Sequence, residues 1–109
     1  MERDYLFVYG SLAKGRKNAV RLEVIGGDWI PATVRGRLKN QGWGAKMGYP
    51  GLIIDDEGDP IEGFVFSSAY LKDYWKALDD FEGSEYGRVR VTAQLDSGQI
   101  IETFAYALK

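Results

Sequence analysis

The sequence contains no cysteine and no histidine among its 109 residues. Without cysteine the protein has no disulfide, no thiolate nucleophile and no zinc–thiolate site. Without histidine it has neither a Ser-His-Asp triad nor an imidazole ligand for a metal ion. These absences exclude most familiar hydrolase mechanisms, and we expect no metal site. Proton transfer in an enzyme of this composition must use a carboxylate, a tyrosine or a lysine.

The chain also lacks a long hydrophobic run and an excess of either charge. No apolar stretch approaches a membrane span, and residues 1–4 lack the apolar segment of a signal peptide. With 14 basic and 16 acidic residues, the formal net charge is −2, which does not favour general binding to nucleic acid or to an acidic membrane. We therefore expect a cytoplasmic protein with neither of these partners. The sequence does not indicate an oligomeric state.

The length and composition are those of one small globular domain. A hydrophobic fraction of 45% and a charged fraction of 28% argue against disorder, and 109 residues suffice to bury one core. The chain shows no repeat, no low-complexity tract and no linker. We expect a single domain over residues 1–109.

Hydrophobic periodicity predicts about six strands and two helices, and hence an α+β domain built on a mixed, strongly curved sheet or small barrel. A serine at position 67 or 68 is expected to cap the second helix, Gly83 to end it, and Asp96-Ser97-Gly98 to form the last hairpin turn. The predicted strands are Leu6–Tyr9, Trp29–Lys39, Gly51–Ile54, Ile61–Phe66, Arg88–Leu95 and Gln99–Leu108. The first predicted helix is Arg16–Ile25. The second carries its apolar stripe at Leu71, Tyr74, Trp75, Leu78 and Phe81.

Two segments are candidates for binding. The first strand ends abruptly at Tyr9 and is followed by Gly10, Ser11 and Leu12. A strand that stops at such a turn leaves unpaired backbone N–H groups, which bind anions or a developing oxyanion. The alternative is an ordinary tight turn. The glycine-rich stretch 40–50, which contains Trp43, is either a binding loop or lid or a solvated connection.

The candidate for chemistry is Glu82, at the end of the second helix. At about 100° per residue, Glu82 lies about 40° around the helix from Leu78 and so faces the core, whereas Asp79 and Asp80 should face solvent. Burial, the helix dipole and the neighbouring acids should all raise the pKa of Glu82. A carboxyl group tuned toward neutrality suits general acid/base catalysis. The alternative is that Glu82 lies in water or pairs with Arg88 or Arg90.

Taken together, these segments resemble the gamma-glutamylcyclotransferase-like proteins, a family that includes the gamma-glutamylamine cyclotransferases. The matching segments occur in the order of the family and span nearly the whole chain. They are Tyr9-Gly10-Ser11-Leu12, Tyr49-Pro50-Gly51-Leu52, Ile61-Glu62-Gly63-Phe64-Val65-Phe66 and Leu78-Asp79-Asp80-Phe81-Glu82-Gly83, followed by Tyr86 and Arg88.

The resemblance implies a small mixed barrel with flanking helices and an intramolecular reaction. The free α-amine of a γ-glutamyl amine or γ-glutamyl amino acid attacks its own γ-carbonyl group, which releases the amine and forms 5-oxoproline. By resemblance, the turn from Tyr9 through Gly10 and Ser11 to Leu12 binds the glutamyl part of this small-molecule substrate. Glu82 is the general acid/base, and Tyr86 and Arg88 are further pocket residues.

This chemistry needs no cysteine, no serine triad, no metal and no cofactor, because the substrate carries its own nucleophile. Two alternatives stay open at this point. The protein could hold a small carboxylate-bearing metabolite in the same pocket without catalysis. It could also be an interaction protein that makes its contact through the loop around Trp43.

Overall fold

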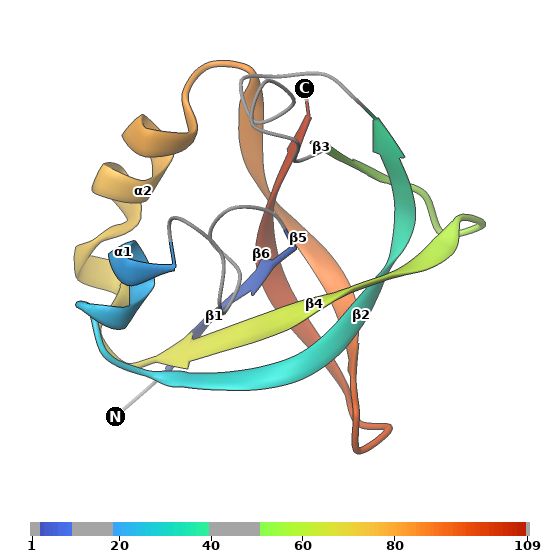
Figure 1. Ribbon diagram of the computed structural model, residues 1–109, viewed down its shortest axis with the longest axis horizontal. Coiled ribbons are helices and arrows are strands. Elements are labelled where there is room, and N and C mark those ends of the chain that lie inside the picture. Colours follow the sequence, from blue (N-terminus) through green and yellow to red (C-terminus); the bar gives the residue numbers. More distant parts are fainter. Residues whose placement is uncertain (1–2, 10–18, 40–50, 109) are drawn as a thin grey trace.

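The strands of this protein form a closed barrel with one additional strand. The computed structural model describes residues 3–9, 19–39 and 51–108. In these ranges six strands form one sheet in the order β3-β2-β4-β1-β6-β5, and β2 also pairs with β5. The second pairing closes β2, β4, β1, β6 and β5 into a barrel, with β3 added alongside β2 (Figure 1). The predicted α+β barrel of about six strands and two helices is confirmed.

Most strands are longer than the sequence predicts, whereas β3 has the predicted bounds. The pairings are antiparallel except for β1 with β6, which is parallel. The strands are β1 (Asp4–Val8), β2 (Asp28–Lys39), β3 (Gly51–Ile54), β4 (Asp59–Ser68), β5 (Tyr86–Leu95) and β6 (Ile100–Leu108).

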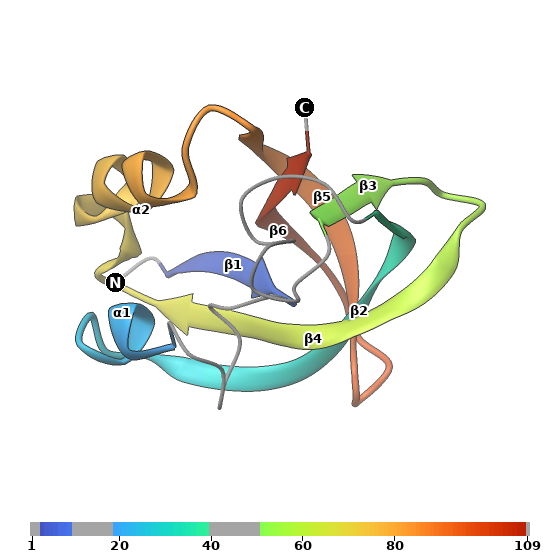
Figure 2. The same cartoon turned by 45° about the horizontal axis from the view of Figure 1, so that its top comes forward.

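Alternation along the strands divides the core into two layers. On β1, Phe7 belongs to a cluster of strand residues only, which fills the barrel, whereas Leu6 and Val8 belong to a second cluster that includes helical residues. The second cluster therefore lies between the barrel and the helices. Both helices lie on the same side of the barrel in Figures 1 and 2. β1 is buried on both faces, which explains its uninterrupted apolar run.

The β5–β6 hairpin agrees closely with its prediction. Gly98 adopts a φ of +92°, and the N–H of Leu95 donates to the carbonyl of Gln99 over 2.8 Å. Residues 105–107 of β6 are buried in succession, so this part of the strand is covered on both faces, as its sequence predicts. The hairpin brings Tyr86 and Arg88 of β5 opposite Leu108 and Tyr106 of β6.

The first helix is shorter than predicted. The sequence favours a helix over Arg16–Ile25, of which residues 16–18 lie outside the described residues. The structure has α1 (Val20–Glu23), in which Leu22 is buried and Val20 is exposed. The chain leaves α1 through Gly26, whose φ of +87° requires glycine.

The second helical segment is divided, which corrects the prediction of one capped helix. A 3₁₀ turn, η2 (Leu71–Asp73), precedes α2 (Trp75–Glu82), and neither has a side-chain cap. Tyr74 lies between them and is 41% exposed, so it does not belong to a buried stripe. Gly83 ends α2 with a φ of +84°, as predicted. None of the helices in the described part of the chain has the length and apolar character of a bilayer crossing.

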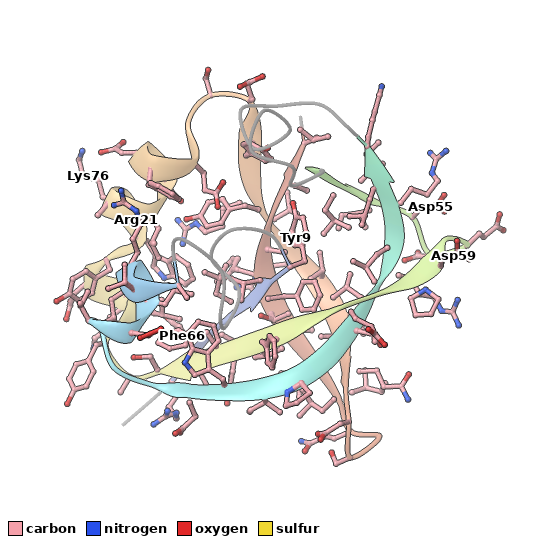
Figure 3. All side chains as sticks on the ribbon, in the orientation of Figure 1. Tyr9, Arg21, Asp55, Asp59, Phe66 and Lys76 are labelled. Atoms are coloured by element: carbon pink, nitrogen blue, oxygen red, sulfur yellow. The ribbon has the colours of Figure 1, made fainter. Side chains whose placement is uncertain are left out.

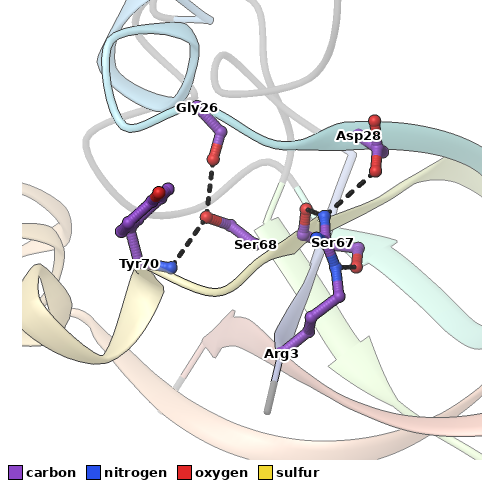
Figure 4. Close-up of polar contacts among 6 residues, drawn as sticks. All are labelled: Arg3, Gly26, Asp28, Ser67, Ser68 and Tyr70. Atoms are coloured by element: carbon purple, nitrogen blue, oxygen red, sulfur yellow. Dashed lines mark hydrogen bonds and ion pairs between the residues drawn. The ribbon is translucent and has the colours of Figure 1, made fainter. Parts of the chain in front are cut away.

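Ser68 does not cap the helix because its hydroxyl has another use. Both candidate serines belong to β4, and the buried Ser68 Oγ donates to the carbonyl of Gly26 over 2.6 Å and accepts from the N–H of Tyr70 (Figure 4). Beside it, Arg3 bonds to Ser67 and to Asp28. These contacts join the residues that precede β1 and β2 to the end of β4. They thereby fix the position of the chain where it leaves β4 and enters η2.

Candidate functional site

Glu82 is the last residue of α2 and lies beside the ends of β1 and β6. Its side chain is half-buried, and burial raises the pKa of its carboxyl group from 4.5 to about 7. The inward orientation predicted from helical phase agrees with this burial. The sequence suggested three causes for a raised pKa of Glu82, and the structure supports burial. The negative charge of Glu82 in turn helps to raise the pKa of Tyr9 and of Tyr106, after desolvation of each phenol.

Tyr9 joins three strands through its hydroxyl group. Its ring stacks on Phe7 inside the barrel, with 6.1 Å between ring centroids (Figure 3). The hydroxyl donates to the carbonyl oxygen of Tyr106 over 2.7 Å and accepts from the N–H of Leu52 over 2.9 Å. Both partners are backbone groups, so Tyr9 fixes where the first strand ends relative to β3 and β6. The next residues of the predicted binding turn, Gly10, Ser11 and Leu12, lie outside the described residues, as does the loop 40–50.

The side chain of Asp79 is 42% exposed, but it also bonds to the barrel, which corrects the prediction that it simply faces solvent. Its Oδ1 accepts a 2.6 Å hydrogen bond from the hydroxyl of Tyr106 and lies 3.2 Å from Nε of Arg88. The contacts come from Tyr106 of β6 and Arg88 of β5, which helical phase does not reveal. Asp80 is exposed as predicted and pairs with Lys76, which points away from the barrel (Figure 3).

Arg88 is a packed side chain rather than a solvated surface charge. Its guanidinium carbon lies 4.3 Å from the ring centroid of Trp75 and 5.1 Å from that of Phe104. Its ion-pair partner is Asp79, whereas Arg90 pairs with Glu102. Arg88 therefore connects α2 with the two C-terminal strands.

A surface depression of about 510 Å³ lies where α2 meets β5 and β6. The predicted pocket residues Tyr86 and Arg88 both line it, and Tyr86 is only 8% exposed. Tyr86 also contributes to the pKa of Tyr9, so the structure brings these residues and Glu82 into one region. The full lining is Asp79, Asp80, Gly83, Ser84, Tyr86, Gly87, Arg88 and Tyr106.

Sequence reasoning missed Tyr106 and the role of Asp79. Tyr106 lies in an apolar strand and is 4% exposed, so it resembles an ordinary core residue. Asp79 precedes Glu82 by nearly one helical turn, a spacing that places the two on neighbouring parts of the helix surface. In the described part of the chain, no three acidic side chains are grouped to hold a metal ion.

Comparison with protein families identifies this arrangement. The model described as "Gamma-glutamyl cyclotransferase, AIG2-like" matches residues 6–109. The chain belongs to this family. The family resemblance predicted from the motifs is therefore confirmed, and the barrel with its helices is the family fold. A comparison with curated protein sequences finds no match.

Solved structures with the same fold come from plants, bacteria and mammals. An Arabidopsis thaliana protein has a TM-score of 0.76 and 23% identity, over 99% of this chain and 63% of its own. YkqA from Bacillus subtilis has a TM-score of 0.74 and 28% identity, over 99% of this chain and 36% of its own. An AIG2-like protein from Mus musculus has a TM-score of 0.74 and 24% identity, over 98% of this chain and 78% of its own. The chain thus spans less than two thirds of the first two proteins.

Proposed function

We propose that this protein catalyses the cyclisation of a γ-glutamyl amine or γ-glutamyl amino acid to 5-oxoproline, with release of the free amine. Membership of the gamma-glutamyl cyclotransferase, AIG2-like family supports the reaction class. The observation that carries the proposal in this chain is the half-buried Glu82, with its pKa raised to about 7. An acid of this strength can both accept and return a proton near neutral pH.

The raised pKa matches Glu82 to its proton donor. Each unit by which the pKa of the acceptor rises lowers the cost of proton transfer from the substrate ammonium by about 1.4 kcal/mol. The rise in the pKa of Glu82 from 4.5 to about 7 therefore lowers this cost by about 3 kcal/mol relative to an ordinary glutamate. Burial of Glu82 thus makes the neutral amine easier to generate.

The reaction then follows within one bound substrate molecule. The neutral α-nitrogen attacks the γ-carbonyl carbon, and the new C–N bond closes a five-membered ring while negative charge develops on the carbonyl oxygen. The bond to the leaving nitrogen breaks as that nitrogen is protonated. Overall the ammonium group loses two protons and the leaving nitrogen gains two, with Glu82 as the carrier. The folded substrate supplies a high effective concentration of nucleophile.

The remaining roles follow the family resemblance. We assign binding of the glutamyl part to the turn formed by Tyr9 and residues 10–12, whose backbone N–H groups suit a carboxylate or an oxyanion. Tyr86 and Arg88 line the depression beside Glu82 and are assigned to the leaving-group side of the pocket.

The test is product formation by purified protein, by Glu82→Gln and by Glu85→Gln. Glu85 lies on the exposed turn after α2 and serves as a matched control for the loss of one nearby carboxylate. Each protein is incubated with γ-glutamyl amino acids, ε-(γ-glutamyl)lysine and simple γ-glutamyl amines, and 5-oxoproline is measured by mass spectrometry. We expect product from wild type and Glu85→Gln, and at least 100-fold less from Glu82→Gln.

Two results would contradict the proposal. Full activity in Glu82→Gln would remove Glu82 from the mechanism. The absence of product from wild type, with thermal stabilisation by one of the compounds, would identify a protein that binds a small metabolite without catalysis.

A further inference from the structure

The hydroxyl of Tyr106 forms a polar connection between α2 and the barrel, one helical turn from Glu82. Tyr106 forms two hydrogen bonds, one through its backbone and one through its side chain. Its backbone carbonyl accepts from Tyr9 at the end of β1, and its side-chain hydroxyl donates to Asp79 on α2. Since the N–H of Leu52 donates to the hydroxyl of Tyr9, these hydrogen bonds link β3 to Tyr106, and the side chain of Tyr106 links the barrel to α2.

Apolar packing holds α2 against the barrel through the buried Leu78 and the partly buried Trp75 and Phe81. The helix has eight residues, and Leu78 is its one fully buried side chain. Asp79, the next residue, is held at 2.6 Å by Tyr106 and at 3.2 Å by Arg88. Apolar contacts are not directional, whereas a hydrogen bond is, so the bond from Tyr106 to Asp79 adds a restraint on the tilt and rotation of the helix.

Arg88 strengthens the same connection from the other side. Its guanidinium group lies over Trp75, the first residue of α2, and over Phe104 of β6, while it pairs with Asp79. It thus contacts α2 near its start and near its middle. Asp79, which Arg88 and Tyr106 both contact, precedes Glu82 by three residues in the same helix, so these contacts lie within one turn of Glu82.

We propose that Tyr106 and Asp79 are positioning residues, which hold the last turn of α2 so that Glu82 stays half-buried beside the ends of β1 and β6. This inference rests on the proposed function for its kinetic consequences. Tyr106 and Asp79 act through Glu82 and carry no proton in the reaction. The raised pKa values of both Tyr9 and Tyr106, caused first by desolvation, agree with phenols that stay protonated in this role.

The central test is Tyr106→Phe, which removes one hydroxyl and keeps the buried ring. Asp79 keeps its partner Arg88 in this variant, so no unpaired charge is created. We expect kcat to fall at least tenfold with KM changed less than twofold, because small displacements of a catalytic group affect the chemical step. Tyr74→Phe, the same change at an exposed position before α2, should leave kcat unchanged.

A second measurement does not depend on activity. The carboxyl carbon of Glu82 is titrated by NMR in wild type and in both tyrosine variants. If Tyr106 holds Glu82 in its half-buried place, the pKa of Glu82 should fall from about 7 by roughly one unit in Tyr106→Phe, because water reaches the carboxylate. It should not change in Tyr74→Phe.

The conservative variant at Asp79 separates positioning from proton transfer. Asp79→Asn keeps an oxygen that can accept from Tyr106 and should retain more activity than Asp79→Ala, which keeps none. Loss of activity in Asp79→Asn equal to that in Glu82→Gln would overturn the positioning role.

An unchanged kcat in Tyr106→Phe, or an unchanged pKa of Glu82, would also overturn it. If wild type itself makes no 5-oxoproline, the proposed function fails, and the titration of Glu82 still decides whether Tyr106 holds it in place.

Discussion

Replacing Glu82 with glutamine should make the folded protein more stable at alkaline pH while it removes activity. The carboxyl group has a pKa of about 7 in the folded protein and 4.5 as its ordinary value. The folded state therefore binds this proton more tightly than the unfolded state does. The free energy of unfolding consequently falls as the pH rises from 4.5 to 7, and the loss persists above pH 7.

The size of the effect follows from the two pKa values. At about 1.4 kcal/mol per pH unit, the full difference amounts to about 3 kcal/mol at pH 8. Water that still reaches the half-buried side chain reduces this figure, so we expect Glu82→Gln to gain about 1 to 3 kcal/mol over wild type. At pH 4.5 the gain should nearly vanish, because Glu82 is then neutral in the folded state.

The assay is urea unfolding of wild type, Glu82→Gln and Glu85→Gln at pH 4.5 and at pH 8. For each variant, the quantity compared between the two pH values is its difference from wild type in the free energy of unfolding. Titrating groups that the variant shares with wild type cancel in this difference. Glu85→Gln should show no such change, since its side chain is exposed. The reasoning fails if Glu82→Gln differs from wild type by the same amount at both pH values. It also fails if wild type gains stability relative to this variant as the pH rises.

Two further substitutions test contacts that hold the site in place. Tyr9→Phe removes a hydroxyl that bonds to two backbone groups, so the free energy of unfolding measured in urea should fall by about 1 to 3 kcal/mol. Tyr74→Phe is its control, and equal urea midpoints for the two variants would contradict the assigned bonds. Ser68→Ala should lower the free energy of unfolding by about 1 to 2 kcal/mol, because it removes a buried hydroxyl with two hydrogen bonds. Thermal unfolding measures this loss against Ser97→Ala, a change at an exposed position, and a loss no larger than that of the control would count against the buried contact.

Features set by neighbouring residues could be predicted from the sequence. The alternation along β2 places Ala32 and Val34 in the core, and the turn ending at Gly98 sets the β5–β6 pairing. The inward orientation of Glu82 was predicted correctly, although the helix begins later than expected. Its phase is measured from Leu78, and both residues lie within α2.

Features set by distant residues could not be predicted in this way. Ser68 looked like a helix cap, but its hydroxyl bonds to Gly26, which is 42 residues away in the chain. Asp79 was predicted to face solvent, but its carboxylate accepts a hydrogen bond from Tyr106, which is 27 residues away in the chain. A helical-phase count places a side chain relative to its own helix and gives no information about which strand lies beyond it.

The family could be recognised because its motifs are short, local and ordered along the chain. The resemblance covers the turn after Tyr9 and the segment ending at Glu82, and the match over residues 6–109 confirms it. The contribution of each residue to catalysis stays a prediction, since family and fold do not by themselves assign it.

The pH dependence of kcat for 5-oxoproline formation tests the central claim most directly. With Glu82 as the group that accepts the substrate proton, kcat should rise with pH through an apparent pKa of about 7, and Glu82→Gln should be inactive across the range. A rise centred near the ordinary carboxyl value of 4.5, or wild-type activity in Glu82→Gln, would contradict the account.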